Sequence, residues 1–403
     1  MLAGAAGLLT LAGVAVCVAS AWPHDSPLVP RHGGLLEGDS AWAWLYLGGE
    51  IAAVVAYAAG VVFARRGARL ATVAALAAAI QLAPLGAPLL ISSDAWTYWD
   101  YGRIAVVHDA NPYRDPPSRF RIDPAYPHIG GAWHDSTSVY GPLFTLASEP
   151  VAAAAGSSKD AAAWLFKALG ALFVLGTVAL CALLVPPGRR PFAVAFAGWN
   201  PLLALHFAGG GHNDAWMAAA VLGALVLAAR RRFGAAGASW AAAIAIKWVA
   251  LVLLPLHWLE ARARRERIGY VGLAAAGAAL AVAATAAFGF HWLGAAGPLA
   301  RNANKETRFA LPHRLTELGA PHWLGLALAG VLFALAYLWL ARQAWRGRAR
   351  LALAAALLLC ATPYLVPWYL VWAVPLAAVE DDPPAQWLTV ALSAYLLSQR
   401  VPI

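Results

Sequence analysis

The sequence has little charge. Only 12% of its 403 residues are Asp, Glu, Lys or Arg, while 61% are hydrophobic. A soluble protein of this length would be about a quarter charged. Apolar runs recur along the chain, and several are long enough to cross a hydrocarbon core of ~30 Å. The composition therefore excludes an ordinary soluble protein and predicts an all-α, polytopic helical membrane protein.

Cysteine is also scarce, and positive charge before the first apolar run is absent. Cys17, Cys181 and Cys360 all lie inside apolar segments, so we expect neither a disulfide framework nor a cysteine metal cluster. Residues 1–21 lack the basic start of a signal peptide, although Ala19-Ser20-Ala21 resembles a cleavage site, and this favours a first transmembrane helix. We see no soluble domain, linker or internal repeat, and we predict one membrane domain over 1–403.

Positive charge is present elsewhere, in five basic clusters that separate the apolar segments. The formal net charge of +9 would suit a nucleic-acid partner, but basic residues gather in the cytoplasmic loops of membrane proteins and explain it better. We therefore expect a multi-pass protein of the plasma membrane, with no nucleic-acid partner. The clusters that we expect to be cytoplasmic are 65–69, 189–190, 230–232, 262–267 and 342–350. The external parts are then 22–41, 92–139, the turn 209–214, and 291–321.

Three apolar segments do not fit a simple crossing. Segment 234–259 has a basic cluster at both ends but is too short for two spans, which predicts a V with Lys247 at its apex. Segment 351–379 has two prolines in "TPYLVPWY", each of which breaks a helix, and it should also form a V. By the same parity, 140–155 is re-entrant or strongly bent. Non-helical backbone at membrane depth needs cover from protein or water, so both apices should line a hydrated cavity.

Polar residues converge on the external side of this topology. Ionisable groups at membrane depth mark function by default. Each also has a structural explanation: Asp94 and the run "HND" as helix caps, Lys247 as a cation that reaches to the interface, and the aromatic residues as an interfacial belt. Because these residues meet on one face of the protein, we favour a functional site over these separate structural explanations. The residues that meet there are Asp94, Tyr140, His212, Asn213, Asp214, Lys247, Trp368 and Tyr369.

Six stretches occur in order over about residues 90–380: "SSDAWTYWDYGR", "NPY", "YGPLFTLASEP", "WNPLLALHFAGGGHNDAWM", "AAAIAIKWVALVLLPL" and "PYLVPWYLVWAVPL". Together they resemble the GT-C membrane glycosyltransferases, and most nearly the actinobacterial polyprenol-phosphate-mannose-dependent α-1,6-mannosyltransferases. The resemblance implies a GT-C fold with an external catalytic loop and Asp94 as the catalytic base. It also implies a polyprenyl-phosphate sugar donor, with mannose as the expected sugar, and a glycolipid or glycan acceptor.

The chemistry of the residues agrees with an inverting transfer. A carboxylate such as Asp94 can take the proton of the attacking hydroxyl, and a cation such as Lys247 or Arg103 can stabilise the charge of the leaving phosphate. Asp100, the rival carboxylate, should orient Arg103 from the same helix face. We expect no cofactor and no metal, although clustered aspartates leave a divalent ion as an alternative. The remaining expected substrate contacts are Trp96, Tyr98, Asn111 and Tyr113.

A transporter or flippase of lipid-linked sugars is the competing interpretation, since broken helices around a membrane cavity suit that class as well. Such a protein is expected to show paired repeats in its two halves, and the sequence shows none.

Overall fold

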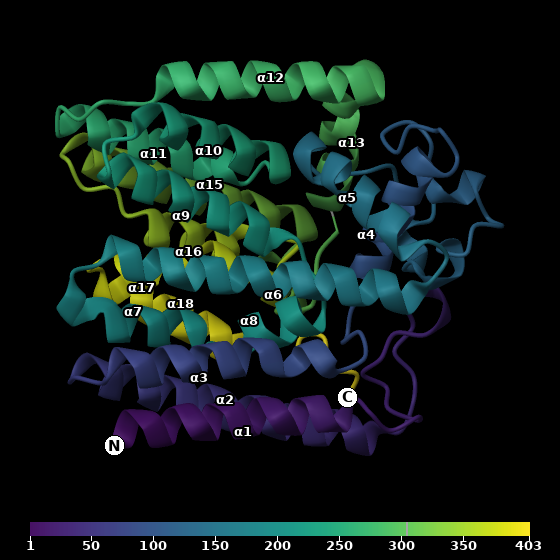
Figure 1. Cartoon of the computed structure of the whole chain (residues 1–403), viewed down its shortest axis with the longest axis horizontal. Helices are drawn as coiled ribbons and strands as arrows, with labels where there is room; N and C mark the ends of the chain where they lie inside the picture. Colours follow the sequence, from purple (N-terminus) through teal and green to yellow (C-terminus); the bar gives the residue numbers. More distant parts are fainter. Residues whose placement is uncertain (304) are drawn as a thin grey trace.

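The computed structural model describes residues 1–303 and 305–403, and every regular element in these residues is helical (Figure 1). The prediction of an all-α, polytopic membrane fold is confirmed. Within the described chain, five helices are long and apolar enough to cross a membrane. They are α1 (Leu2–Ser20), α2 (Ser40–Arg65), α6 (Lys159–Leu184), α12 (Tyr270–Phe288, continued by the 3-10 turns η8, Gly289–Ala295) and α15 (His322–Trp345).

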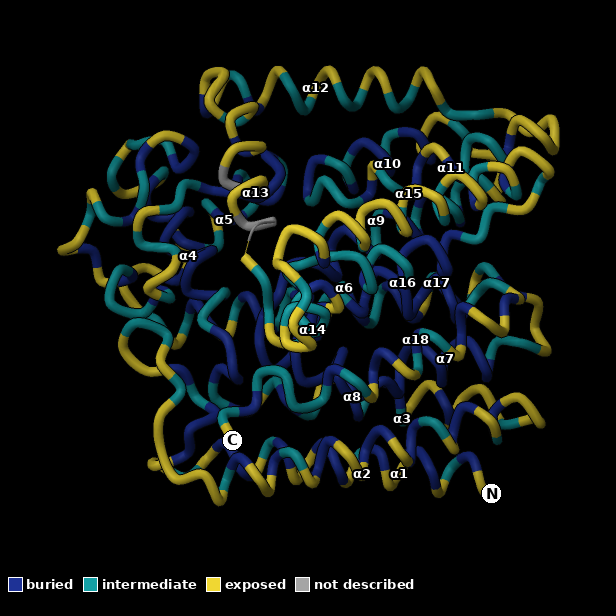
Figure 2. Tube along the Cα trace, turned by 180° about the vertical axis from the view of Figure 1, so that it is seen from behind, coloured by how far each residue is buried: buried dark blue, intermediate teal, exposed yellow. Residues whose placement is uncertain are grey.

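Shorter helices fill the space between these five. Several of them are apolar on most sides, which is typical of helices that lie inside a bundle or a membrane. Figure 2 shows the contrast: much of the middle of the molecule is buried, whereas α12 alternates between exposed and intermediate residues along its length. The shorter helices are α3 (Leu70–Leu82), α4 (Asp94–Val106), α5 (Pro142–Ala155), α7 (Arg190–Gly198), α8 (Pro201–Leu203), α9 (Asp214–Ala229), α10 (Phe233–Ile246), α11 (Ala250–Ala263), α13 (Ala296–Ala303), α14 (Leu311–Glu317), α16 (Leu351–Ala361), α17 (Val374–Val379) and α18 (Pro383–Tyr395).

Both predicted V-shaped segments are confirmed. The helix of 234–259 breaks at Lys247, between α10 and α11. In 351–379, α16 ends before the prolines, a 3-10 helix η9 (Pro367–Trp372) follows, and α17 runs back. The two ends of this second segment meet, because the amides of Leu351 and Ala352 donate to the carboxylate of Glu380 at 2.8 and 3.1 Å.

Segment 140–155 is not strongly bent, and whether it is re-entrant stays a prediction. Its helix α5 is continuous and begins against the end of α10, where the amide of Gly141 donates to the carbonyl of Ile246. A Cβ at Gly141 would lie 2.1 Å from the Ala245 carbonyl oxygen, so only glycine allows this approach. The other end of α5 lies beside α4, where the carbonyl of Gly156 accepts hydrogen bonds from the side chains of Trp99 and Arg103.

The structure also contains a break that the sequence interpretation missed. The apolar run 191–208 bends by 51° between α7 and the π-helix η7 (Ala204–Gly209). Asn200 caps the new start, and its side-chain oxygen accepts from the amides of Leu202 and Leu203. Gln81 of α3 donates to the carbonyls of Gly198 and Asn200. The backbone groups freed by the bend are therefore satisfied inside the protein.

This break explains one correction. The turn 209–214 was expected to be external, but His212 and Asp214 are completely buried and Asn213 nearly so. The bent segment stops short of the surface, so α9 starts from inside the bundle. The segments 22–41, 92–139 and 291–321 lie mainly at the right of Figure 1. Asn304, in the last of them, lies outside the described residues.

The five basic clusters lie at the opposite end of the bundle, at the left of Figure 1. We call this the basic end. Side-chain contacts with the turn between α17 and α18 link two of the clusters: Arg189 is 3.9 Å from Asp381, and Arg350 pairs with Asp382 at 2.6 Å. The predicted grouping of the clusters is thus present. Which side of the membrane they face stays a prediction.

Candidate active site

A cavity of about 350 Å³ lies where the two V-shaped segments meet the start of α4. Both apices line it, as the sequence predicted, and the segment before α5 closes another side. Its wall is rich in aromatic rings but includes one carboxylate and one ammonium group. The lining residues are Asp94, Tyr98, Trp133, Val139, Tyr140, Lys247, Trp248, Val249, Val252, Leu358, Thr362, Tyr364, Trp368, Tyr369 and Trp372.

Asp94 is the first residue of α4, and its side chain is 18% exposed. Asp94 does not cap α4, because Ser93 occupies the N-cap position. At the start of α4, within the described residues, no side chain makes a capping hydrogen bond. Burial raises the pKa of the Asp94 carboxyl, but His212, Arg400 and Lys247 together outweigh that effect, so its pKa is lowered. An ionised carboxylate therefore faces the cavity at neutral pH.

His212 lies directly behind Asp94. Its Nδ1 is 3.2 Å from Asp94 Oδ2, a close contact that is poorly aligned for a hydrogen bond. The imidazole lies flat on Trp368, with ring centroids 3.7 Å apart and an angle of 12°. The stack fixes the plane of the imidazole, and the imidazole in turn limits where the Asp94 carboxylate can move.

Lys247 projects from the apex between α10 and α11. Its Nζ pairs with Asp214 Oδ1, which also accepts from Trp372 Nε1 at 2.7 Å. The ammonium also lies 4.6 Å from the ring centroid of Tyr369 and 5.5 Å from that of Trp372. These are cation–π distances. These contacts hold the Lys247 side chain in the cavity lining.

Asn213 and Asp214 were expected to contact the sugar or the acceptor. The Asp214 carboxylate is committed to Lys247 and Trp372, so it acts on the cavity through Lys247. Asn213 is buried, and neither polar atom of its side chain has a partner in the described chain. Neither residue lines the cavity, and a helix-capping bond is absent at the described start of α9 as well.

Two other predicted contacts lie in the packed interior of the loop. Trp96 donates to the carbonyl of Lys159 at 2.9 Å and packs against His128. Arg103 pairs with Asp123 at 2.8 Å and donates to the carbonyl of Gly156 at 2.6 Å. Both side chains are occupied away from the cavity, so Lys247 remains as the cation in its lining.

The expected link between Asp100 and Arg103 is wrong. Both carboxyl oxygens of Asp100 are buried without a hydrogen-bond partner in the described residues. The Arg103 guanidinium instead donates to the carboxylate of Asp123, twenty positions later in the chain. Burial and the nearby Asp123 raise the pKa of Asp100 to about 8. Asp100 is thus protonated at neutral pH and is a poor candidate for the base.

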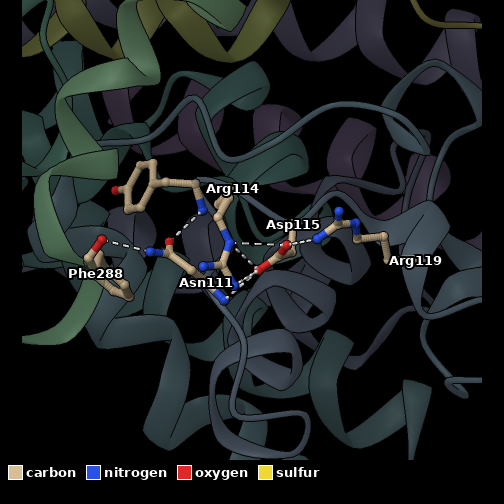
Figure 3. A network of polar contacts seen from close by, with 6 residues as sticks. Asn111, Arg114, Asp115, Arg119 and Phe288 are labelled. Carbon is tan, nitrogen blue, oxygen red and sulfur yellow. Dashed lines mark hydrogen bonds and ion pairs between the residues drawn. The ribbon is translucent and has the colours of Figure 1, made fainter.

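Asn111 and Tyr113 hold the loop in place (Figure 3). Asn111 donates to the carbonyl of Phe288, at the end of α12, at 2.6 Å and accepts from the amide of Tyr113 at 3.0 Å. The Tyr113 hydroxyl donates to the carbonyl of Tyr140 at 2.9 Å. Asp115, in the same network, pairs with Arg114 at 2.9 Å and with Arg119. These contacts fasten the loop to α12 and to the cavity wall; direct contact with substrate stays a prediction.

Several cavity residues were missed by the sequence interpretation. Trp372 and Tyr364 fall within the quoted proline-rich stretch, so its aromatic content was a usable signal. Trp133 comes from the long loop, with no distinguishing pattern. Arg400, near the end of the described chain, does not line the cavity but lies 5.2 Å from the ring centroid of Trp368, which does. A lone cation after the last apolar run was the only trace of its position.

No group of three or more His, Cys, Asp or Glu side chains in the described residues is arranged to hold a metal ion. A reaction without a metal stays a prediction.

Comparison with known proteins adds independent evidence. Residues 1–262 match the family described as alpha-(1->6)-mannopyranosyltransferase, N-terminal domain. The chain is 30% identical to alpha-(1->6)-mannopyranosyltransferase A of Mycobacterium tuberculosis, over 51% of this chain and 44% of that protein. It is 28% identical to a probable alpha-(1->6)-mannopyranosyltransferase of Mycolicibacterium smegmatis, over 76% of this chain and 65% of that protein. The chain thus spans between about half and two thirds of these relatives. No solved structure matches it.

Proposed function

Because this chain belongs to the alpha-(1->6)-mannopyranosyltransferase family, we propose that it is a membrane glycosyltransferase. It transfers a mannosyl group from a polyprenyl-phosphate donor to a glycan or glycolipid acceptor. The basic clusters support an orientation in which the basic end is cytoplasmic and the active-site cavity opens to the extracytoplasmic face.

The observation that carries this proposal is the pairing of Asp94 and Lys247 in one cavity. They come from segments about 150 positions apart in the sequence. Asp94 is kept ionised by its cationic neighbours, and Lys247 is held by Asp214 and two aromatic rings. A carboxylate and an ammonium group in one largely apolar pocket are suited to take up a proton and to stabilise a leaving anion.

In the proposed reaction, an acceptor hydroxyl oxygen attacks the anomeric carbon of the donor. The bond from that carbon to the phosphate oxygen breaks, and its electron pair leaves with the polyprenyl phosphate. The hydroxyl proton passes to Asp94. A single in-line displacement of this kind inverts the anomeric configuration. His212 and its stack on Trp368 hold Asp94 in place, and Lys247 faces the departing phosphate.

The cavity wall supports a lipid-linked donor. Val249, Val252 and Leu358 contribute apolar side chains to the cavity lining, and Asp94 and Lys247 contribute charged ones. A donor with a phosphate between a sugar and a polyprenyl chain needs both kinds of contact. The aromatic rings of Tyr98, Tyr140 and Trp368 offer flat surfaces against which a sugar face can pack.

The test is a transfer assay with purified protein in proteoliposomes. It would use a panel of polyprenyl-phosphate sugars and a short mannoside acceptor, with products identified by mass spectrometry. We expect transfer from polyprenyl-phosphate mannose and a product longer by one hexose. Movement of the donor across the bilayer without any product would instead support the flippase alternative.

A further inference from the structure

A second and larger cavity, of about 1210 Å³, lies at the basic end, away from the candidate active site. The turns α9–α10, α11–α12, α15–α16 and α17–α18 surround it. The glycosyl transfer proposed above makes no use of it. Its lining includes six arginines: Arg231, Arg264, Arg265, Arg267, Arg348 and Arg350.

Most acidic side chains of this cavity already have partners. Asp382 pairs with Arg350 at 2.6 Å, and Glu260 pairs with Arg264 at 2.9 Å. Glu380 accepts from two backbone amides at the start of α16. These contacts fix the cavity walls and leave their carboxylates with little capacity to neutralise further arginines.

Four guanidinium groups remain: Arg231, Arg265, Arg267 and Arg348 have no ion pair within the residues that the structure describes. On the acidic side, Glu266 likewise has no ion pair there, and Asp381 is 3.9 Å from Arg189. The cavity therefore has an excess of unpaired positive charge, with side chains from three different turns.

Two of these arginines occupy backbone positions at which glycine is the usual residue. The helices α9, α11 and α15 end in the same pattern of hydrogen bonds, in which the next two amides turn back to the last helical turn. This motif places the residue after the cap in the left-handed region, where glycine is strongly preferred. After α15 that residue is Gly347 (φ 85°), but after α9 and α11 it is Arg231 (φ 59°) and Arg265 (φ 55°).

The surroundings point to a lipid rather than a soluble anion. Arg231, Arg265 and Arg267 also line a neighbouring open groove that includes Tyr270 and Val271 at the start of α12. These two apolar residues are 52% and 83% exposed on a helix suited to cross the membrane. Basic pockets between membrane helices, next to exposed aromatic residues, lie at the depth of lipid headgroups.

We propose that the cavity at the basic end binds the phosphate of an anionic lipid headgroup, chiefly through Arg231, Arg265, Arg267 and Arg348. This lipid is a bound partner and not the sugar donor, which occupies the other cavity. The proposal is independent of the transfer reaction and holds or fails without it.

The sharpest test is the double variant Arg231→Gly/Arg265→Gly. Glycine relieves the left-handed backbone at both positions, so the melting temperature should be unchanged or higher. Native mass spectrometry would compare retention of phosphatidylglycerol and phosphatidylcholine from mixed micelles. Wild-type protein should retain phosphatidylglycerol preferentially, and the variant should lose about fivefold in affinity for each arginine removed.

The matched control is Arg66→Gln/Arg69→Gln, which removes two exposed arginines of the basic end that do not line the cavity. It should retain the lipid. Unchanged retention in the folded glycine variant would overturn the proposal, and so would wild-type affinity for inorganic phosphate equal to that for phosphatidylglycerol. If the glycine variant does not fold, Arg267→Gln/Arg348→Gln provides the same comparison with the backbone untouched.

Discussion

The two carboxyl groups on α4, Asp94 and Asp100, lie in surroundings that shift their pKa values in opposite directions. Asp94 has cationic neighbours that lower its pKa, whereas burial and Asp123 raise the pKa of Asp100 to about 8. They are six positions apart on α4, so they point to different sides of it. The face that each residue occupies, and not its type, decides which of them can accept a proton.

Asp100 gives a prediction about stability and pH. Its folded pKa lies above its unfolded value, so its contribution to stability is present at acidic pH and is lost as pH rises from about 4 to about 8. Asp100→Asn removes that loss. The free energy of unfolding of the variant minus that of the wild type should therefore be larger at pH 8 than at pH 4, by at least about 1 kcal/mol. Thermal melts at both pH values measure this, and parallel changes in the two proteins would contradict it.

Lys247 gives a prediction that separates binding from folding. Lys247→Met leaves the Asp214 carboxylate buried without its cation, which should cost about 3 kcal/mol of stability. The double variant Lys247→Met/Asp214→Asn removes both charges and should recover most of that stability without recovering use of the donor. Melting temperature and the Michaelis constant for the donor are the two readouts. A double variant with normal donor kinetics would show that Lys247 has only a structural role.

The sequence identified individual residues where membrane depth made them unusual. Asp94 and Lys247 were expected in the cavity because a charge at that depth requires a reason. Arg103 and Trp96 could not be placed in this way, since their partners, Asp123 and the carbonyl of Lys159, depend on how the long loop folds. A pattern of residue types contains no information on such pairings.

At the scale of elements, the broken helices position the site. The prolines of "TPYLVPWY" and the basic clusters around 234–259 made two breaks predictable. The break at Asn200 was not predictable, because it depends on Gln81 from α3 to satisfy the free carbonyls. The burial of His212 follows from that break, and this is why the turn 209–214 was misplaced.

The contact between α5 and α10 is testable at Gly141. A Cβ there would lie 2.1 Å from the Ala245 carbonyl oxygen, two positions before Lys247. Gly141→Ala should therefore displace α5 from the apex, lower stability by about 1–3 kcal/mol and reduce transfer activity. Gly176→Ala is the control, because nothing lies within 4 Å of the position of its added Cβ. If both variants melt and react alike, close packing at Gly141 is not required.

At the scale of the whole molecule, the basic clusters and the candidate active-site cavity lie toward opposite ends. We predict that the basic end is cytoplasmic and that 92–139 is external. Cysteines introduced at Arg264 and at Pro116 would be labelled with a membrane-impermeant reagent in intact cells. Label should appear at position 116 and not at 264, and the reverse pattern would invert the proposed orientation.

The central claim is that this membrane protein transfers a sugar with Asp94 as the base, and one assay tests it most directly. Purified Asp94→Asn and Asp100→Asn would be compared with the wild type in transfer from polyprenyl-phosphate mannose, with donor binding measured separately. Asparagine at position 94 keeps the size of the side chain but cannot accept the proton. We predict a loss on the order of a hundredfold or more in turnover for Asp94→Asn, largely intact donor binding, and near-normal turnover for Asp100→Asn. Near-normal turnover by Asp94→Asn would contradict the account.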